Sequence, residues 1–205
     1  MADAGIKVIV VNSKTDSTDA VALGYVGPDD YRAGEMLAEW VVENCPEGGK
    51  FAHCQGVIGN SAQIARGEGM AAVMAEHPEF EMVVESACEW QADKAANVAL
   101  DVITQYGDEL VAIICDNDDM SSAAQKTCND NGRSDVVCVG VDGNENPLRM
   151  VQSGEMGATV LQDGPAQVGG AIEMIKACLA GETPEKEIAI PFVLVTKDNV
   201  DEYLK

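Results

Sequence analysis

The chain has 205 residues, of which 46% are hydrophobic, and its 13 Lys and Arg against 35 Asp and Glu give a net charge of −22. The hydrophobic fraction is too high for a disordered acidic tail, and no run of about 18 apolar residues indicates a membrane span. So negative a chain repels phosphate backbones and anionic lipids. Nucleic acid and a bare membrane surface are therefore excluded as partners, and a neutral or cationic small ligand is favoured.

Short β-branched runs alternate with amphipathic stretches from residue 7 onward, which is typical of βαβ units on a parallel sheet. The predicted strands cover residues 7–11, 21–26, 50–55, 81–87, 110–115, 136–141, 158–161 and 187–195. The predicted helices cover residues 29–44, 61–77, 91–106 and 164–179. The predicted fold class is therefore α/β, with a doubly wound parallel sheet.

All four predicted helices carry apolar stripes at helical spacing, and we expect these stripes to pack in the core. In residues 91–106 the stripe consists of Ala92, Ala96, Ala99, Leu100 and Ile103. In residues 164–179 the stripe consists of Val168, Ile172, Ile175 and Leu179.

The seven cysteines contain no C-x-x-C pair, and an odd number cannot close completely into disulfides within one chain, so we expect reduced thiols. Cys115 and Cys138 lie inside apolar runs and should be buried as small hydrophobic residues. The only two histidines are His53, expected to be structural within a strand, and His77, expected to be solvated. Neither a metal site nor a cofactor is expected from so few ligating side chains.

Ligands of open parallel sheets bind at the carboxyl ends of the strands, where loops converge. Trp90 follows the predicted strand 81–87, and its flat ring can stack on the C–H face of a sugar. Asn117 and Asp142 occupy equivalent strand-end positions and can bind hydroxyl groups. Arg66, near the start of helix 61–77, could add a fork of donors. The structural alternatives are a half-buried loop tryptophan and a solvated helix arginine.

The sequence gives little support for a phosphate or calcium site at this edge. The glycine loop 56–61 has neither G-x-G-x-x-G nor G-x-x-x-x-G-K-[ST], so phosphate binding is not expected. The acidic run 116–119 lacks the spacing of a calcium loop, and Asp118 and Asp119 suit the first turn of a helix.

Four segments, in order along the chain, carry a family resemblance: 55–69 (QGVIGNSAQIARGEG), 115–120 (CDNDDM), 139–143 (VGVDG) and 195–200 (VTKDNV). With their strand and helix context, they resemble the ribose-binding-protein-like family of periplasmic sugar-binding proteins, the type I periplasmic binding proteins. The resemblance implies a two-lobed, hinged receptor that closes on a monosaccharide or polyol at the cleft between its lobes and delivers it to the permease of an ABC importer. Such a receptor is not an enzyme.

The resemblance also implies roles for single residues. Arg66, Asn117 and Asp142 match residues that bind sugar hydroxyls, and Trp90 matches an aromatic residue that stacks on the ring. The other matched positions are Gln162, near the hinge, Asn12, where the family often has a sugar-binding Asp, and Ser13, where ribose binders carry Arg. The difference at Ser13 argues against ribose itself, and pentoses, hexoses and polyols all stay open.

The family begins with about three further βα units that this chain lacks. The resemblance therefore implies an incomplete first lobe, residues 1–28 and 163–193, and a complete second lobe, residues 29–162 and 194–205. An incomplete lobe exposes apolar surface, so we expect either a homodimer formed through it or association with the missing piece. The resemblance implies that a full-length parent lies outside the cytoplasm. This chain shows no signal peptide and, if complete, is expected in the cytoplasm.

Two other classes of protein are alternatives. The effector-binding core of a lactose-repressor-type regulator shares this fold, but such regulators usually have Asp-Asp where this chain has Asp142 and Gly143. They also carry an amino-terminal helix-turn-helix, which this sequence lacks. An enzyme could use Asp116 and Asp142 as an acid–base pair, but no nucleophile or metal ligand accompanies them.

Overall fold

The computed structural model describes residues 6–15 and 17–204 of the chain. The chain divides into two compact units. The first unit comprises Met1–Asp29 and Gln162–Phe192, and the second comprises Asp30–Leu161 and Val193–Lys205. Each boundary lies one residue from a lobe boundary expected from the sequence.

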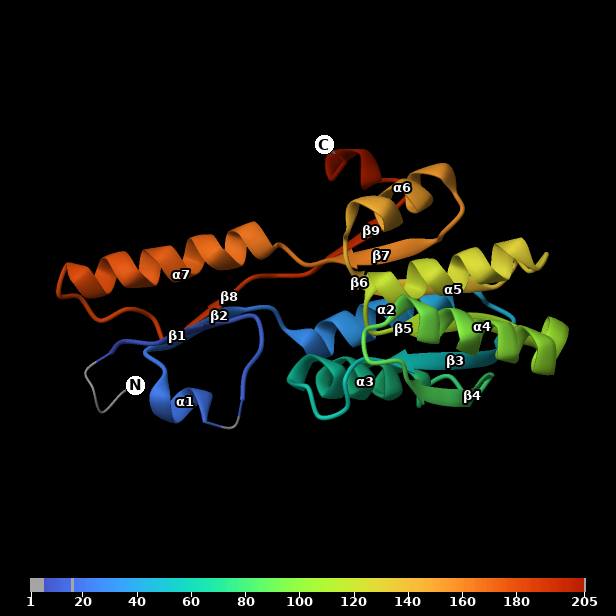
Figure 1. Cartoon of the computed structure of the whole chain (residues 1–205), viewed down its shortest axis with the longest axis horizontal. Coiled ribbons are helices and arrows are strands. Elements are labelled where there is room, and N and C mark those ends of the chain that lie inside the picture. Colours follow the sequence, from blue (N-terminus) through green and yellow to red (C-terminus); the bar gives the residue numbers. More distant parts are fainter. Residues whose placement is uncertain (1–5, 16, 205) are drawn as a thin grey trace. The chain divides into compact units, whose positions relative to one another are not determined.

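The second unit is built on a six-stranded sheet with the order β4-β3-β5-β6-β7-β9 (Figure 1). Neighbouring strands run parallel except β7 and β9, which are antiparallel. The strands are β3 (Gly49–Gln55), β4 (Phe80–Ala87), β5 (Leu110–Cys115), β6 (Val137–Asp142), β7 (Ala158–Leu161) and β9 (Val193–Thr196). The predicted α/β class is confirmed.

Helices cover both faces of this sheet, as a doubly wound fold requires. Ala52 and Cys54 of β3 face a core shared with α4 and α5. His53, which points to the other face, lies beside Gly67 of α3. The helices of the second unit are α2 (Asp30–Asn44), α3 (Ser61–Met74), α4 (Ala92–Tyr106), α5 (Asp118–Asp130) and α6 (Glu145–Ser153). Helices α5 and α6 were not delimited from the sequence, and the predicted helix 61–77 ends three residues beyond α3.

The apolar core between the sheet and the helices α4 and α5 contains most of the cysteines. Cys115 and Cys138 are free and completely buried, as predicted. The predicted stripe on α4 is only partly correct: Ala99 and Ile103 are buried, but Ala92 and Leu100 are exposed. The helix is rotated so that Ala95 and Val102, which were not in the predicted stripe, face the core instead.

The first unit contains a smaller parallel sheet with the order β1-β2-β8. Its elements are β1 (Ile9–Val11), α1 (Thr18–Val21), β2 (Gly24–Gly27), α7 (Gly164–Leu179) and β8 (Glu187–Ala189). The predicted strand 21–26 is wrong at its start, because Val21 ends α1 and the strand begins at Gly24. The predicted strand 187–195 is two strands, β8 and β9, which flank Pro191 and belong to different sheets.

The predicted burial of the stripe on α7 is wrong. Val168, Ile172, Ile175 and Leu179 are 55%, 46%, 48% and 84% exposed. The face of α7 that packs on β1 and β2 instead contains Ala171 and Met174. A sheet of three short strands covers only a narrow face of a sixteen-residue helix, so the rest of the apolar surface stays uncovered.

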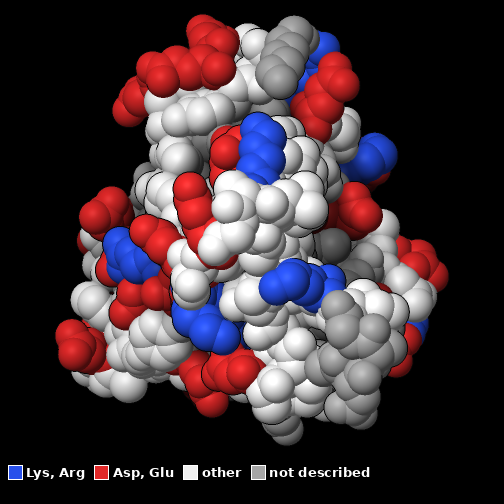
Figure 2. Space-filling view, turned by 90° about the vertical axis from the view of Figure 1, so that its left-hand side faces the viewer, with Lys and Arg blue, Asp and Glu red and all other residues white. Residues whose placement is uncertain are grey.

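Among the charged side chains on the face seen in Figure 2, the acidic ones cover more of the surface than the basic ones, and the basic ones do not merge into one patch. This distribution follows from the net charge of −22. In the part of the chain that the structure describes, no helix combines the length and the apolar character of a membrane span.

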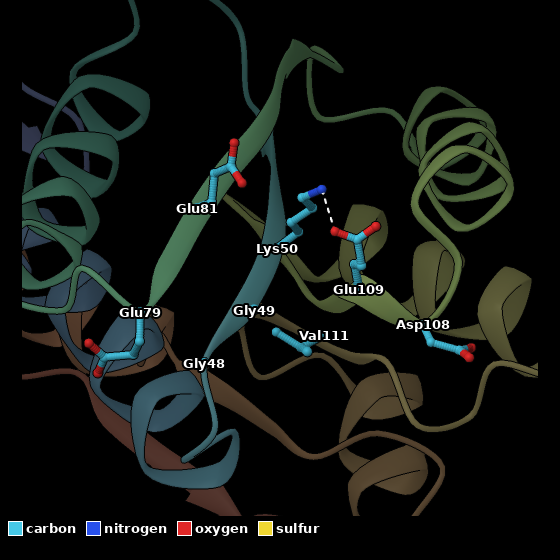
Figure 3. A pocket seen from close by; sticks show the side chains of 8 residues that line it. All are labelled: Gly48, Gly49, Lys50, Glu79, Glu81, Asp108, Glu109 and Val111. Atoms are coloured by element: carbon cyan, nitrogen blue, oxygen red, sulfur yellow. Dashed lines mark hydrogen bonds and ion pairs between the residues drawn. The ribbon is translucent and has the colours of Figure 1, made fainter.

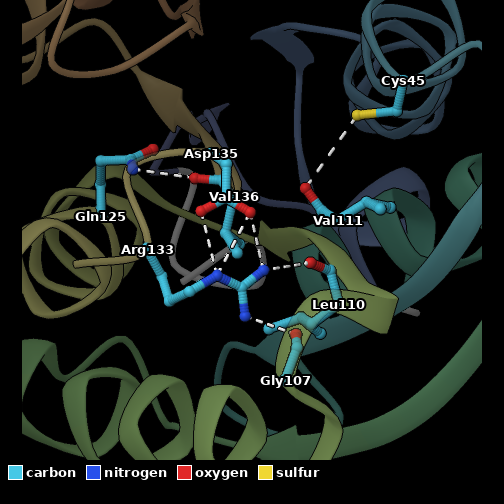
Figure 4. Close-up of polar contacts among 8 residues, drawn as sticks. All are labelled: Cys45, Gly107, Leu110, Val111, Gln125, Arg133, Asp135 and Val136. Atoms are coloured by element: carbon cyan, nitrogen blue, oxygen red, sulfur yellow. Dashed lines mark hydrogen bonds and ion pairs between the residues drawn. The ribbon is translucent and has the colours of Figure 1, made fainter. Parts of the chain in front are cut away.

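Arg133 links two loops at the amino end of the central strands (Figure 4). Its Nη1 donates to the carbonyl of Gly107, and its Nη2 donates to the carbonyl of Leu110 at 3.0 Å. The guanidinium also pairs with Asp135, with 2.8 Å between Nη2 and Oδ2. The entry to β5 is therefore tied to the connection that leads into β6.

Replacing Arg133 by Met should lower the free energy of unfolding by about 1–3 kcal/mol, because two carbonyls lose their donor in a part-buried loop. Urea denaturation measures the change. The control is Arg149→Met, which removes only an exposed ion pair with Glu145 and should change stability by less than about 0.5 kcal/mol. Equal effects of the two substitutions would contradict this role of Arg133.

Candidate functional site

Four predicted site residues of the second unit lie at one edge of its sheet. Trp90 follows β4, Asn117 follows β5 and Asp142 ends β6. Arg66, in the second turn of α3, reaches the same edge through the carbonyl of Asp116. Because β4, β3, β5 and β6 are neighbours and run parallel, their carboxyl ends form one continuous edge.

Arg66 is a buried cation, only 5% exposed. Its Nη1 donates to the carbonyl of Asp116 at 2.5 Å. Its Nε and Nη2 approach Oδ1 of Asp30 at 3.0 and 2.8 Å. Gly34 of α2 lets the two helices come this close, because a Cβ there would lie 2.0 Å from the carbonyl oxygen of Arg66. The solvated alternative for this arginine is therefore wrong.

Trp90 lies in a strained turn. Both Glu89 and Trp90 have positive φ, at 55° and 65°, which is uncommon for residues other than glycine. The half-buried ring of Trp90 packs over Gly56, where a Cβ would come within 2.1 Å of the ring carbons. The position of the Trp90 ring therefore depends both on this turn and on the absence of a side chain at Gly56.

Asp142 also has positive φ, at 144°, and its carboxylate is half-buried. Burial raises the pKa of Asp142 to about 6, against the opposing effect of the Arg66 cation. Asn144 donates to Oδ2 of Asp142 at 3.4 Å. Asp142 can therefore accept hydrogen bonds as a carboxylate at neutral pH and donate one when protonated.

Asp118 supports the loop that carries Asp142. Its Oδ2 accepts from the backbone N–H groups of Gly143 and Asn144 at 2.8 and 3.0 Å, and its Oδ1 accepts from the hydroxyl of Thr159 at 2.7 Å. Asp118 is completely buried, and burial raises its pKa to about 7. The expected place of Asp118 in the first turn of a helix is correct, but its side chain holds a distant loop.

Asn117 caps helix α5, because its Oδ1 accepts from the backbone N–H of Met120 at 3.1 Å. Asn117 directly follows Asp116, and the capping bond holds its carboxamide at the edge of the sheet. Asn117 is half-buried.

The remaining two predicted residues meet within the first unit. Nε2 of Gln162 donates to Oδ1 of Asn12 at 2.5 Å. Asn12 has positive φ, at 72°, and its carbonyl accepts from the hydroxyl of Tyr25 at 2.7 Å. The structure thus groups Asn12 with Gln162 in the first unit and the other four in the second unit.

Three further residues that shape this edge were not predicted from the sequence. Asp30, His53 and Asp118 were not among the predicted site residues, although each bonds a residue 25 to 63 positions away in the chain. No local pattern reveals such contacts. The buried place of His53 agrees with its expected structural role.

The opposite edge of the same sheet carries a separate cavity of about 300 Å³ (Figure 3). Four acidic side chains line it together with Lys50, whose Nζ lies 2.6 Å from Oε2 of Glu109. None of the predicted site residues lies there. Among the described residues, no group of three His, Cys, Asp or Glu side chains is arranged to hold a metal ion.

Comparison with known proteins identifies the family. Residues 1–183 match the periplasmic binding protein domain, and the chain therefore belongs to this family. It is 30% identical over 197 residues to the xylitol-binding protein of Mycolicibacterium smegmatis, covering 96% of this chain and 56% of that protein. It is 27% identical over 192 residues to the ribose import binding protein of Salmonella typhimurium, covering 93% of this chain and 64% of that protein.

Solved structures show the same relationship. An ABC transporter solute-binding protein from Bacillus halodurans with bound myo-inositol has a TM-score of 0.91 and 29% identity. The match covers 98% of this chain and 70% of that protein. The myo-inositol-binding protein of Caulobacter has a TM-score of 0.87 and 28% identity. The fold is thus that of ABC solute-binding proteins, and the chain spans only part of the length of these relatives.

Replacing Asp118 by Asn should flatten the pH dependence of folding. Burial raises the pKa of Asp118 from 3.8 to about 7, so between these values the folded state holds a proton that the unfolded chain releases. Stability contributed by this group is present below pH 3.8 and is lost as the pH rises through about 7. Between about pH 4.5 and about pH 8, the free energy of unfolding measured in urea should fall on the order of 2–4 kcal/mol more for the parent than for D118N.

The control for this measurement is Asp119→Asn, which changes an exposed residue on the same turn. D119N should keep the slope of the parent. Parallel curves for the parent and D118N would mean that Asp118 is not protonated in the folded state near neutral pH.

Proposed function

We propose that this chain is the sugar- or polyol-binding portion of a solute receptor that serves an ABC importer. The observation that carries the proposal is the single sheet edge of the second unit, where Trp90, Arg66, Asn117 and Asp142 come together. An aromatic face beside a cation, a carboxamide and a carboxylate offers a stacking surface with both donors and acceptors. Polyhydroxylated ligands need this combination, because every hydroxyl both donates and accepts.

The relatives support the ligand class. Their names and bound ligands are xylitol, ribose and myo-inositol, all small, neutral and rich in hydroxyl groups. Neutral ligands also suit a chain with a net charge of −22. We therefore propose a pentose, an inositol or a polyol of similar size, held by Arg66, Asn117 and Asp142 through its hydroxyls and by Trp90 through its C–H face.

The proposal also covers the full-length form, because the members of this family are longer than this chain. Asn12 and Gln162 remain ligand-binding candidates on the first unit. The family and its relatives favour a binding protein over an enzyme or a regulator, a permease as its partner, and a place outside the cytoplasm for the full-length form.

A thermal-shift screen with xylitol, ribose, myo-inositol, arabinose and galactose tests the ligand class. Binding to the folded state raises Tm, and a ligand at about 100 times its Kd contributes about 2.7 kcal/mol. Trp90→Ala and Asp142→Asn should each weaken the binding of the responding ligand about tenfold or more, because each removes a direct contact. Calorimetric titration measures the loss.

The matched controls are Trp40→Phe, which alters the buried tryptophan of α2, and Asp119→Asn. Both should bind as the parent does. No response to any sugar or polyol, or equal losses in controls and site variants, would count against the proposal.

We also propose that two copies of this chain associate through α7. The stripe of Val168, Ile172, Ile175 and Leu179 repeats at spacings of four, three and four residues and is uncovered. Such spacing lets two helices pack side by side along one apolar seam. A second copy presents the same stripe, so the pairing is self-complementary.

Sedimentation velocity over a range of concentrations measures this association. Ile172→Glu should shift the chain to monomer, because it introduces a charge into the seam. Leu100→Glu is the control, since Leu100 is 45% exposed on a helix of the second unit. A parent that stays monomeric at high concentration would rule out the dimer.

A further inference from the structure

His53 is a buried ionisable residue that the proposed binding chemistry does not use. It lies on β3, between β4 and β5, and is 1% exposed. Both of its ring nitrogens approach carboxylates. Nδ1 lies 3.2 Å from Oε1 of Glu85, and Nε2 lies 2.9 Å from Oδ1 of Asp116. We name these three residues, Glu85, His53 and Asp116, the His53 clamp.

The geometry of the clamp selects the charged form of the ring. A neutral imidazole has one donor and one acceptor nitrogen, so one carboxylate oxygen would face a lone pair. The imidazolium donates at both nitrogens and satisfies both carboxylates. Two oppositely charged neighbours also provide the pairing that a buried cation needs.

The charged groups around the clamp come from every element packed against it. β4 contributes Glu85, the loop after β5 contributes Asp116, and α3 contributes Arg66, which in turn pairs with Asp30 of α2. Gly67 of α3 is the residue beside Cε1 of His53 and carries no side chain. The anions and cations thus alternate from Glu85 to Asp30.

Asp116 connects His53 to the residues of the proposed binding edge. Its Oδ2 accepts from the backbone N–H of Gly56 at 2.7 Å, and its carbonyl accepts from Nη1 of Arg66 at 2.5 Å. Gly56 is the residue on which the ring of Trp90 packs. One carboxylate and one carbonyl of a single residue therefore place both the stacking ring and the cation of the edge.

We propose that His53 is a positioning residue for the sugar-binding edge, which it holds in the binding arrangement only while its ring is protonated. The inference rests on the proposed function and deepens it, because it makes ligand binding depend on pH through a residue that does not contact the ligand. Deprotonation removes one of the two charge-assisted bonds of the clamp. Asp116 then loses its fixed orientation toward Gly56 and Arg66.

The direction of the pH effect follows from the environment. Burial lowers the pKa of His53, but the hydrogen bonds and charges of Asp116 and then Glu85 outweigh it, and the pKa is raised above 6.5. Stability and edge geometry that depend on the charged ring are therefore fully present below pH 6.5 and are lost as the pH rises through the raised pKa.

NMR of the two histidine rings tests the clamp without any ligand. His77, which is 33% exposed and the only other histidine, is replaced by Gln to assign the spectrum and serve as the matched control. Between about pH 5.5 and about pH 9.5, His53 should titrate above its ordinary value. The indole N–H of Trp90 should shift with the same midpoint, and that of Trp40 should not.

The same titration on variants separates positioning from simple folding. In His53→Gln, the pH-dependent shift of Trp90 should disappear, and in H77Q it should persist. Glu85→Gln changes a side chain that is 47% exposed, so it should fold even where H53Q does not. E85Q should lower the midpoint of both the His53 ring and the Trp90 indole. A His53 ring that is neutral below pH 6.5, or a Trp90 shift unchanged in E85Q, would overturn the proposal.

Titration with xylitol, ribose and myo-inositol then connects the clamp to binding. The affinity of the parent and of H77Q for the responding probe should fall about tenfold as His53 loses its proton. That of H53Q should be weaker and should lack the fall whose midpoint matches that of the His53 ring in the parent, while any change due to Asp142 or Asp118, whose pKa values are about 6 and about 7, should persist. A fall at the His53 midpoint that H53Q retains would contradict the proposal. If no probe binds at any pH, the proposed function fails, and the ligand-free Trp90 and His53 midpoints still decide whether the clamp exists.

Discussion

Arg66 imposes the constraint on which the candidate binding edge depends, because a buried guanidinium is tolerated only when it is paired and hydrogen-bonded. Its partners are the carboxylate of Asp30 on α2 and the carbonyl of Asp116 after β5. Asp116 is itself buried, and its carboxylate is shared by His53 and the N–H of Gly56. These ion pairs and hydrogen bonds join α2, α3, β3 and the loop after β5 at the edge of the sheet that carries the candidate site.

Backbone strain is concentrated at the same edge. Trp90 and Asp142 both adopt positive φ, which costs energy that the surroundings must supply. Packing over Gly56 holds Trp90, and the bonds from Gly143 and Asn144 to Asp118 hold the loop after Asp142. The edge is thus held in one arrangement by contacts within the protein, so a ligand bound there would need to order fewer groups.

The sequence pattern predicted the α/β class and most elements because strands such as Leu110–Cys115 are continuous apolar runs and helices such as Gly164–Leu179 have clear periodicity. It failed where tertiary context decides. The stripe on α7 looks like core, yet the small sheet of the first unit covers the other face of that helix. Strand ends also indicated Trp90, Asn117 and Asp142. The links made by Asp118 and His53 could not be predicted, because they join residues far apart in the chain.

The two tryptophans can report directly whether a sugar binds at the candidate edge. Trp90 lies at the carboxyl edge of the sheet, whereas Trp40 is buried in α2. In a titration of the ¹⁵N-labelled chain with xylitol or myo-inositol, the indole signal of Trp90, the Nε signal of Arg66 and the amide of Asn117 should move together to saturation. The signal of Trp40 should stay in place. Saturable shifts that exclude Trp90 and Arg66, or no shift with any sugar or polyol, would contradict a binding site at this edge.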